Sequence, residues 1–153
     1  MKIIFSIILF GGLITSTVFA QNDSPKPAFS VDIVTPTNKQ AGNMNYLLSL
    51  SDKDLKNQKY VFYTDSNATV AYVRINGDMV RLTGGSNPEN IMAYTAKGYT
   101  VTLKLNQNTS NEILNNTEDH ISVKKEATLV IYSNSGKSVV SNVIGAQINE
   151  IGK

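Results

Sequence analysis

The sequence contains no cysteine and no tryptophan, and its only histidine is His120. Without cysteine no disulfide can form, so the stability of the fold must come from packing and strand pairing. Soft metal ions also lose the thiolate ligands that they prefer. A lone histidine among scattered carboxylates lacks the spacing of a metal site, and we therefore predict neither a metal nor another cofactor.

A surplus of charge of either sign is also missing. Apart from Lys2, the chain carries thirteen Lys and Arg residues against twelve Asp and Glu residues. A surface that binds nucleic acid needs a concentrated basic field. This balance excludes nucleic acid from the expected partners.

The longest apolar run lies at the start of the sequence. Lys2 precedes the stretch "IIFSIILFGGLI", and the small-residue ending "VFA" stops at Ala20. This arrangement is typical of a signal peptide over residues 1–20. The run is shorter than the roughly 20 apolar residues of a membrane-spanning helix. We expect a secreted or periplasmic protein that begins near Gln21 and has no stable membrane span after cleavage; the alternative is an uncleaved anchor.

The rest of the chain has the length of one ordinary domain. Residues 21–29, "QNDSPKPAF", contain two prolines and polar side chains, which predicts a flexible leader. We expect residues 30–153 to form a single β domain, because short β-branched and aromatic segments alternate there with turn residues. The expected strands cover residues 30–35, 45–51, 59–64, 70–75, 78–82, 91–95, 99–105, 127–133 and 138–148.

This pattern predicts an all-β fold, a small antiparallel barrel or sandwich of about seven to nine strands built from hairpins. We favour the barrel, because closing a sheet pairs its edge strands without any disulfide. Helix is limited to a turn or two after Ser51, where "SDKD" has the form of an N-terminal cap. We expect residues 106–120 to form a long polar connection with at most one helical turn. We expect residues 121–125 to form a short edge strand.

The segment "AYVRINGDMVRL", residues 71–82, specifies the register of one hairpin. Asn76-Gly77 is the strongest short hairpin signal, because a type I′ turn needs a positive φ at both central residues. With these two residues as the loop, the apolar side chains of both arms share one face, and a slip by one residue would bury both arginines. The predicted pairs are Ile75 with Asp78, Val73 with Val80 and Ala71 with Leu82. Two further hairpins are expected around residues 96–98, with Gly98 in a left-handed conformation, and around residues 134–137.

The other face of the first hairpin carries Tyr72, Arg74 and Arg81. Tyrosine and arginine are favoured at protein interfaces, so these three residues are candidates for binding an acidic or carbohydrate partner. The alternative is an ordinary solvent-exposed sheet face, which antiparallel sheets commonly keep.

No catalytic residue is predicted. His120 has Glu118 and Asp119 beside it, but the sequence contains no G-x-S-x-G elbow. A hydrolase that used His120 would need a serine or a carboxylate within hydrogen-bond reach of the ring. Asn67, Asn108 and Asn115 match the glycosylation acceptor pattern, which matters only in a eukaryotic source.

From Tyr60 to Leu105 the order of features resembles the membrane-bound or periplasmic C-type lysozyme inhibitors, which are small secreted β-barrels. "YVFYTDSNATVAYVRINGDMVRL" is followed by a Gly-Ser loop, a tyrosine-containing strand, "KG" and an alternating strand. The family carries a serine in an S-G-x-x-Y loop and a lysine in a W-x-K-G segment, which approach the catalytic carboxylates of lysozyme. The resemblance implies these roles for Ser86 and Lys97. This chain differs in having Asn87 after Ser86 and in lacking the tryptophan and the cysteine pair.

We therefore expect a secreted or periplasmic binding module without catalytic activity, of which an inhibitor of a lysozyme-like glycosidase is the sharpest form. Its partner would be a secreted protein, such as a lysozyme, or a glycan. The candidate binding residues are Ser86, Lys97, Tyr72, Arg74 and Arg81. The alternative is a structural or stress protein of the envelope with no specific ligand.

Overall fold

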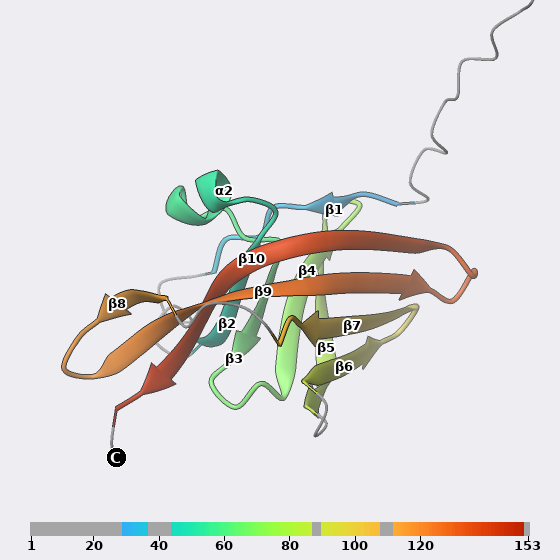
Figure 1. Ribbon diagram of the computed structural model, residues 1–153. Coiled ribbons are helices and arrows are strands. Elements are labelled where there is room, and N and C mark those ends of the chain that lie inside the picture. Colours follow the sequence, from blue (N-terminus) through green and yellow to red (C-terminus); the bar gives the residue numbers. More distant parts are fainter. Residues whose placement is uncertain (1–28, 37–43, 87–89, 108–111, 152–153) are drawn as a thin grey trace, which may run out of the picture.

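The computed structural model describes residues 29–36, 44–86, 90–107 and 112–151 (Figure 1). The expected signal peptide and nearly all of the leader lie outside these residues. The described residues form ten strands and one short helix: β1 (Val31–Asp32), β2 (Met44–Ser49), α2 (Asp52–Lys56), β3 (Phe62–Asp65), β4 (Val70–Ile75), β5 (Asp78–Ser86), β6 (Ile91–Ala96), β7 (Tyr99–Leu105), β8 (Ile113–Asn116), β9 (His120–Ser133) and β10 (Ser138–Glu150).

Eight of these strands close into an antiparallel barrel. Following the hydrogen bonds gives the order β4-β3-β2-β10-β9-β7-β6-β5, and β5 pairs with β4 again. β1 is added beside the end of β4, and β8 is added beside the start of β9. The all-β prediction is confirmed, and of its two architectures the chain adopts the barrel.

The hairpin of β4 and β5 has the register that the sequence specifies. Asn76 and Gly77 form the turn with φ angles of 51° and 87°. Both values lie in the left-handed region that a type I′ turn requires. The observed pairs include Ile75 with Asp78, Val73 with Val80 and Ala71 with Leu82.

The other two predicted hairpins are also present. Lys97 and Gly98 join β6 to β7, and Gly98 has a φ of 96°. β9 and β10 pair along the whole length of β10, and in Figure 1 they form the long ribbon that crosses the barrel. Ser51 caps α2 as predicted, because its Oγ accepts a hydrogen bond from the backbone N–H of Asp54 at 3.1 Å.

Two predictions between β7 and β10 were wrong. Within residues 106–120, Ile113–Asn116 form strand β8, and the other described residues form no helical turn. Residues 121–125 are no separate edge strand, because they belong to the 14-residue β9 and pair with β10. Asn-rich β8 lacks an alternating apolar pattern, and Glu126 interrupts the apolar pattern of β9, so neither strand is visible in the sequence.

The barrel interior is filled with apolar and aromatic side chains. Phe29, at the last position of the expected leader, is buried there. Its ring packs edge to face on the ring of Tyr99, with 5.8 Å between the ring centroids. Tyr94 is fully buried, donates its hydroxyl hydrogen to the Ala68 carbonyl at 2.9 Å, and has a pKa that burial raises. The buried residues of this core are Phe29, Tyr46, Leu48, Val61, Phe62, Ala71, Val73, Ile75, Leu82, Met92, Tyr94, Val101, Leu103, Ala127, Leu129, Ile131 and Val143.

A second apolar cluster covers the outer face of β2 and β3. Leu47 and Tyr63 face each other across these strands and point away from the barrel interior. Val34 packs over them, held by a hydrogen bond from its backbone N–H to the Tyr60 carbonyl at 2.7 Å. The segment after β1 therefore forms a strap across this part of the barrel wall.

Two glycines lie where neighbouring strands approach closely. A Cβ at Gly84 would stand 2.0 Å from the Ala93 carbonyl oxygen, and one at Gly145 would stand 1.9 Å from the Leu47 carbonyl oxygen. No side chain fits at such distances, so both positions need glycine. Gly85, the next residue after Gly84, has open space around its Cβ position.

We expect Gly84→Ala and Gly145→Ala each to lower the free energy of unfolding by about 2–3 kcal/mol, because the strands must move apart to admit the methyl group. Gly85→Ala is the matched control, and it should change the stability by less than about 1 kcal/mol. Urea unfolding followed by circular dichroism measures all three. Equal losses in Gly84→Ala and Gly85→Ala would contradict the role of close approach.

Candidate functional site

Four side chains form a surface on the outer wall of β4 and β5, which we call the Tyr–Arg face: Tyr72, Arg74, Met79 and Arg81. In the ladder Tyr72 lies directly opposite Arg81, and Arg74 lies directly opposite Met79. Residues opposite each other or two apart on one strand share a face of the sheet. The structure thus brings three of the five predicted binding residues together.

Tyr72 is fixed in place by the second apolar cluster. Its ring stacks on the ring of Tyr63 with a centroid distance of 4.8 Å and an interplanar angle of 16°. Tyr63 is only 2 % exposed, so the stack is anchored in the barrel wall. Tyr72 is therefore half-buried and fixed in position on this face.

Arg74 is half-buried, and its Nε is enclosed without a hydrogen-bond partner among the described residues. Asp32 of β1 lies opposite it in the ladder. The Asp32 carboxylate instead accepts hydrogen bonds from the Gly77 backbone N–H at 2.7 Å and the Ser30 hydroxyl at 3.2 Å. Asp32 therefore neutralises part of the local charge without forming an ion pair with Arg74.

Arg81 and Met79 form the exposed part of the Tyr–Arg face, and Met79 is 44 % exposed. Like Arg74, Arg81 forms no ion pair within the described part of the chain. Two guanidinium groups on one surface repel each other and attract anions, since each presents a fork of N–H donors. The guanidinium groups of the Tyr–Arg face can bind carboxylate or phosphate groups, and the apolar side chain of Met79 lies beside them.

Ser86 and Lys97, the other two predicted binding residues, are not brought together. Ser86 ends β5 and pairs with Met92 near the start of β6, whereas Lys97 lies in the turn at the far end of β6. Five residues along a strand span roughly 16 Å. The two residues therefore lie at opposite ends of the same strand pair, and neither belongs to the Tyr–Arg face.

His120 lies at the first position of β9, after the turn from β8. Its ring Nδ1 is 3.1 Å from the hydroxyl oxygen of Thr117. The same hydroxyl oxygen lies 3.2 Å from the backbone N–H of His120. Thr117 and His120 thus form a local turn contact, and within residues 112–151 no serine or carboxylate is hydrogen-bonded to the ring.

Sequence reasoning missed a hollow on the outer wall, in which β9 and β10 form the floor and the start of α2 forms one side. We call it the β9–β10 hollow, and its volume is about 470 Å³. Its lining comes from four separate stretches of the chain, so no spacing or motif reveals it. The lining residues are Leu50, Ser51, Asp52, Asn106, Glu126, Ala127, Asn142, Val143 and Ile144.

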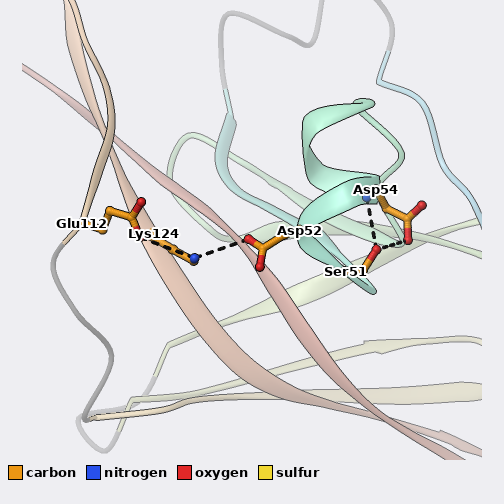
Figure 2. A network of polar contacts seen from close by, with 5 residues as sticks. All are labelled: Ser51, Asp52, Asp54, Glu112 and Lys124. Atoms are coloured by element: carbon orange, nitrogen blue, oxygen red, sulfur yellow. Dashed lines mark hydrogen bonds and ion pairs between the residues drawn. The ribbon is translucent and has the colours of Figure 1, made fainter.

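A charged network borders this hollow (Figure 2). The Lys124 ammonium lies 3.3 Å from a carboxylate oxygen of Asp52 and 3.4 Å from one of Glu112. The hydrogen bond to Asp52 is the main reason why the pKa of Lys124 is raised. Lys124 thus joins the start of α2 to the residue before β8, and Figure 2 shows its side chain between the two carboxylates.

The fold and the surfaces define a class: a closed, eight-stranded antiparallel barrel with a packed interior, whose available side chains lie on its outer wall. Comparison with protein-family models, with curated proteins and with solved structures finds no match. No helix among the described residues is long and apolar enough to cross a membrane. No group of three His, Asp or Glu residues in the same ranges is placed to hold a metal ion.

We expect Arg74→Met to leave the free energy of unfolding unchanged or to raise it by up to about 1 kcal/mol. The substitution keeps a long straight side chain and removes an enclosed N–H that has no acceptor. Arg81→Met is the matched control, since an exposed position should change stability by less than about 0.5 kcal/mol. Chemical denaturation measures both. A loss above about 1 kcal/mol in Arg74→Met would show that Arg74 serves the fold.

Proposed function

We propose that this protein is a secreted or periplasmic binding module without catalytic activity, and that it holds an acidic region of a partner protein on its Tyr–Arg face. The location rests on the signal-peptide pattern of residues 1–20. The binding surface rests on one observation above all. Two arginines share this face and neither forms an ion pair within the described part of the chain.

The cost of Arg74 to the fold supports this proposal. A buried polar group without a partner usually destabilises a protein, so its presence needs an explanation other than stability. A partner carboxylate would not reach the enclosed Nε, but it could bind the other N–H groups of the same guanidinium. Hydrogen bonds between ionised groups are shorter and stronger than those between neutral ones.

The arrangement of the face also suits a protein partner. Tyr72 is held by its stack on Tyr63, so little side-chain freedom is lost on binding. Met79 adds an adaptable apolar contact next to the charges. Interfaces are enriched in this combination of tyrosine, arginine and methionine.

Poly-L-glutamate serves as the probe for this site, with the full mature protein and fluorescence anisotropy at low and high ionic strength. We expect binding that weakens with added salt and falls about tenfold for each of Arg74→Gln and Arg81→Gln, because each loses a charge-assisted contact. The double variant Lys53→Gln/Lys56→Gln removes two exposed charges from α2 and should bind as the wild type does.

If the arginine and the lysine variants weaken binding equally, the attraction is general and the Tyr–Arg face is not the site. If no binding occurs at low ionic strength, the proposal fails. A structural or stress protein of the envelope without a specific ligand would then be the better account.

Inhibition of a lysozyme-like glycosidase is the sharper form of the proposed function, and it rests on the sequence resemblance of residues 60–105. It predicts that the mature protein slows the lysis of bacterial cell walls by a C-type lysozyme. If the Lys97 ammonium lay between the two catalytic carboxylates of the lysozyme, one could not act as the general acid and the other could not act as the nucleophile. Lys97→Ala should then abolish inhibition, while Lys137→Ala, in the turn between β9 and β10, should not. Unchanged lysis at micromolar protein would remove this form and leave the binding of acidic partners untouched.

A further inference from the structure

The β9–β10 hollow lies on the side of the barrel opposite the Tyr–Arg face. In the closed ring of eight strands, β3 and β2 separate the two surfaces in one direction, and β6 and β7 separate them in the other. The two surfaces share no residue. Whatever binds in the hollow is therefore independent of the proposed function.

Most polar side chains that line the hollow either accept hydrogen bonds only or can both donate and accept them. Asp52 and Glu126 contribute carboxylates, which only accept when ionised, while Asn106 and Asn142 contribute carboxamides. Among the residues that the structure describes, no lysine or arginine lines the hollow itself. The matching ligand must offer several hydroxyl groups, each of which can donate to a carboxylate and accept from an amide.

Apolar surface lies beside these acceptors. Leu50 is 52 % exposed at the edge of the hollow, and Ile144 belongs to its floor. A sugar ring has hydroxyl groups around its edge and C–H groups on its faces, so it needs both kinds of contact at once. Small-molecule sites typically combine apolar lining with a few convergent polar groups in about 300–1,000 Å³, which includes the volume of this hollow.

A cation fits the hollow less well, although two carboxylates line it. The Lys124 ammonium already lies 3.3 Å from Asp52, so this carboxylate is paired and a second cation would be repelled. A bound calcium ion would also need six to eight oxygen ligands at 2.3–2.6 Å, roughly. The hollow has a volume of about 470 Å³, which is too large for its walls to surround a calcium ion at these distances.

From this combination of acceptors, amides and apolar floor, we propose that the β9–β10 hollow binds one unit of a neutral carbohydrate. Glu126 accepts hydrogen bonds from two neighbouring hydroxyl groups, Asn142 orients the ring, and Leu50 covers one of its faces. Asp52 is held in position by Lys124 and provides a further acceptor at the rim.

The test is a titration of the isotope-labelled mature protein, followed by amide NMR shifts. The probes are the methyl glycosides of glucose, galactose, mannose and N-acetylglucosamine. We expect at least one glycoside to cause saturable shifts at Glu126 and Asn142 in the millimolar range. Glu126→Gln should weaken this binding about tenfold, because the neutral amide no longer accepts from both hydroxyl groups.

Glu118→Gln removes a carboxylate from the exposed turn before β9 and should leave the titration unchanged. Asn142→Leu fills the hollow with an apolar side chain and should abolish the shifts while the remaining spectrum stays folded. The proposal is overturned if none of the four glycosides causes saturable shifts, or if the shifts map outside the hollow. It is also overturned if calcium chloride or methylamine shifts these residues and the glycosides do not.

The two binding proposals can fail separately. Arg74→Gln should bind the glycoside as the wild type does, and Glu126→Gln should bind poly-L-glutamate as the wild type does. A variant that lost both ligands would point to a change in the fold, which its amide spectrum would reveal.

Discussion

The pairing of β10 with β2 is the constraint on which the barrel depends. Every other neighbouring pair in the ring joins a barrel strand to the next barrel strand along the chain. The pair of β2 and β10 instead joins two distant segments, residues 46–49 and residues 144–147. It is the seam that turns an open meander into a ring. Gly145 stands in this seam against the Leu47 carbonyl oxygen, so the backbones can meet only because no side chain intervenes. Once the seam is formed, each of the eight barrel strands has a neighbour on both sides, and the ring closes without a disulfide.

Much of this architecture could be predicted from local signals. Asn76-Gly77 specified both the turn and the register of β4 and β5, because a type I′ turn and the apolar alternation agree on one pairing. The position of Gly98 and the cap at Ser51 were predicted for the same kind of reason. In each case the decisive interactions lie within a few residues of the chain. Signals of this kind predict hairpins and caps, but they do not predict which distant strands meet.

The candidate sites show where such reasoning ends. Tyr72, Arg74 and Arg81 could be placed together because one hairpin carries all three. The stack of Tyr72 on Tyr63 could not be predicted, since it needs the pairing of β3 with β4 and the strap that buries Tyr63. The β9–β10 hollow is still less accessible to prediction, because its residues meet only after the seam has formed. Ser86 and Lys97 were linked by resemblance alone, and chain order gave no indication that they lie at opposite ends of β6.

The interior of the eight-stranded barrel is filled with side chains, and the two surfaces described above lie on its outer wall. Here two parts of that wall differ in chemistry. One carries guanidinium groups beside an aromatic stack, and the other carries carboxylates and amides around an apolar floor. Because a rigid ring separates them, a molecule bound to one would not compete for space with a molecule bound to the other. Such a barrel could join an acidic protein to a carbohydrate without moving any part of itself.

The two ends of the described chain lie in different surroundings, which bears on how the protein can be handled. Near the first end, β1 pairs with β4 so that Asp32 lies opposite Arg74. Near the other end, the backbone N–H of Ile151 donates to the Asp119 carbonyl at 2.9 Å, at the tip of the ribbon beyond the barrel. A linker fused directly to β1 would begin beside Arg74, whereas one fused directly to Ile151 would begin beside Asp119. The two points of attachment therefore differ in which part of the barrel a fused linker meets first.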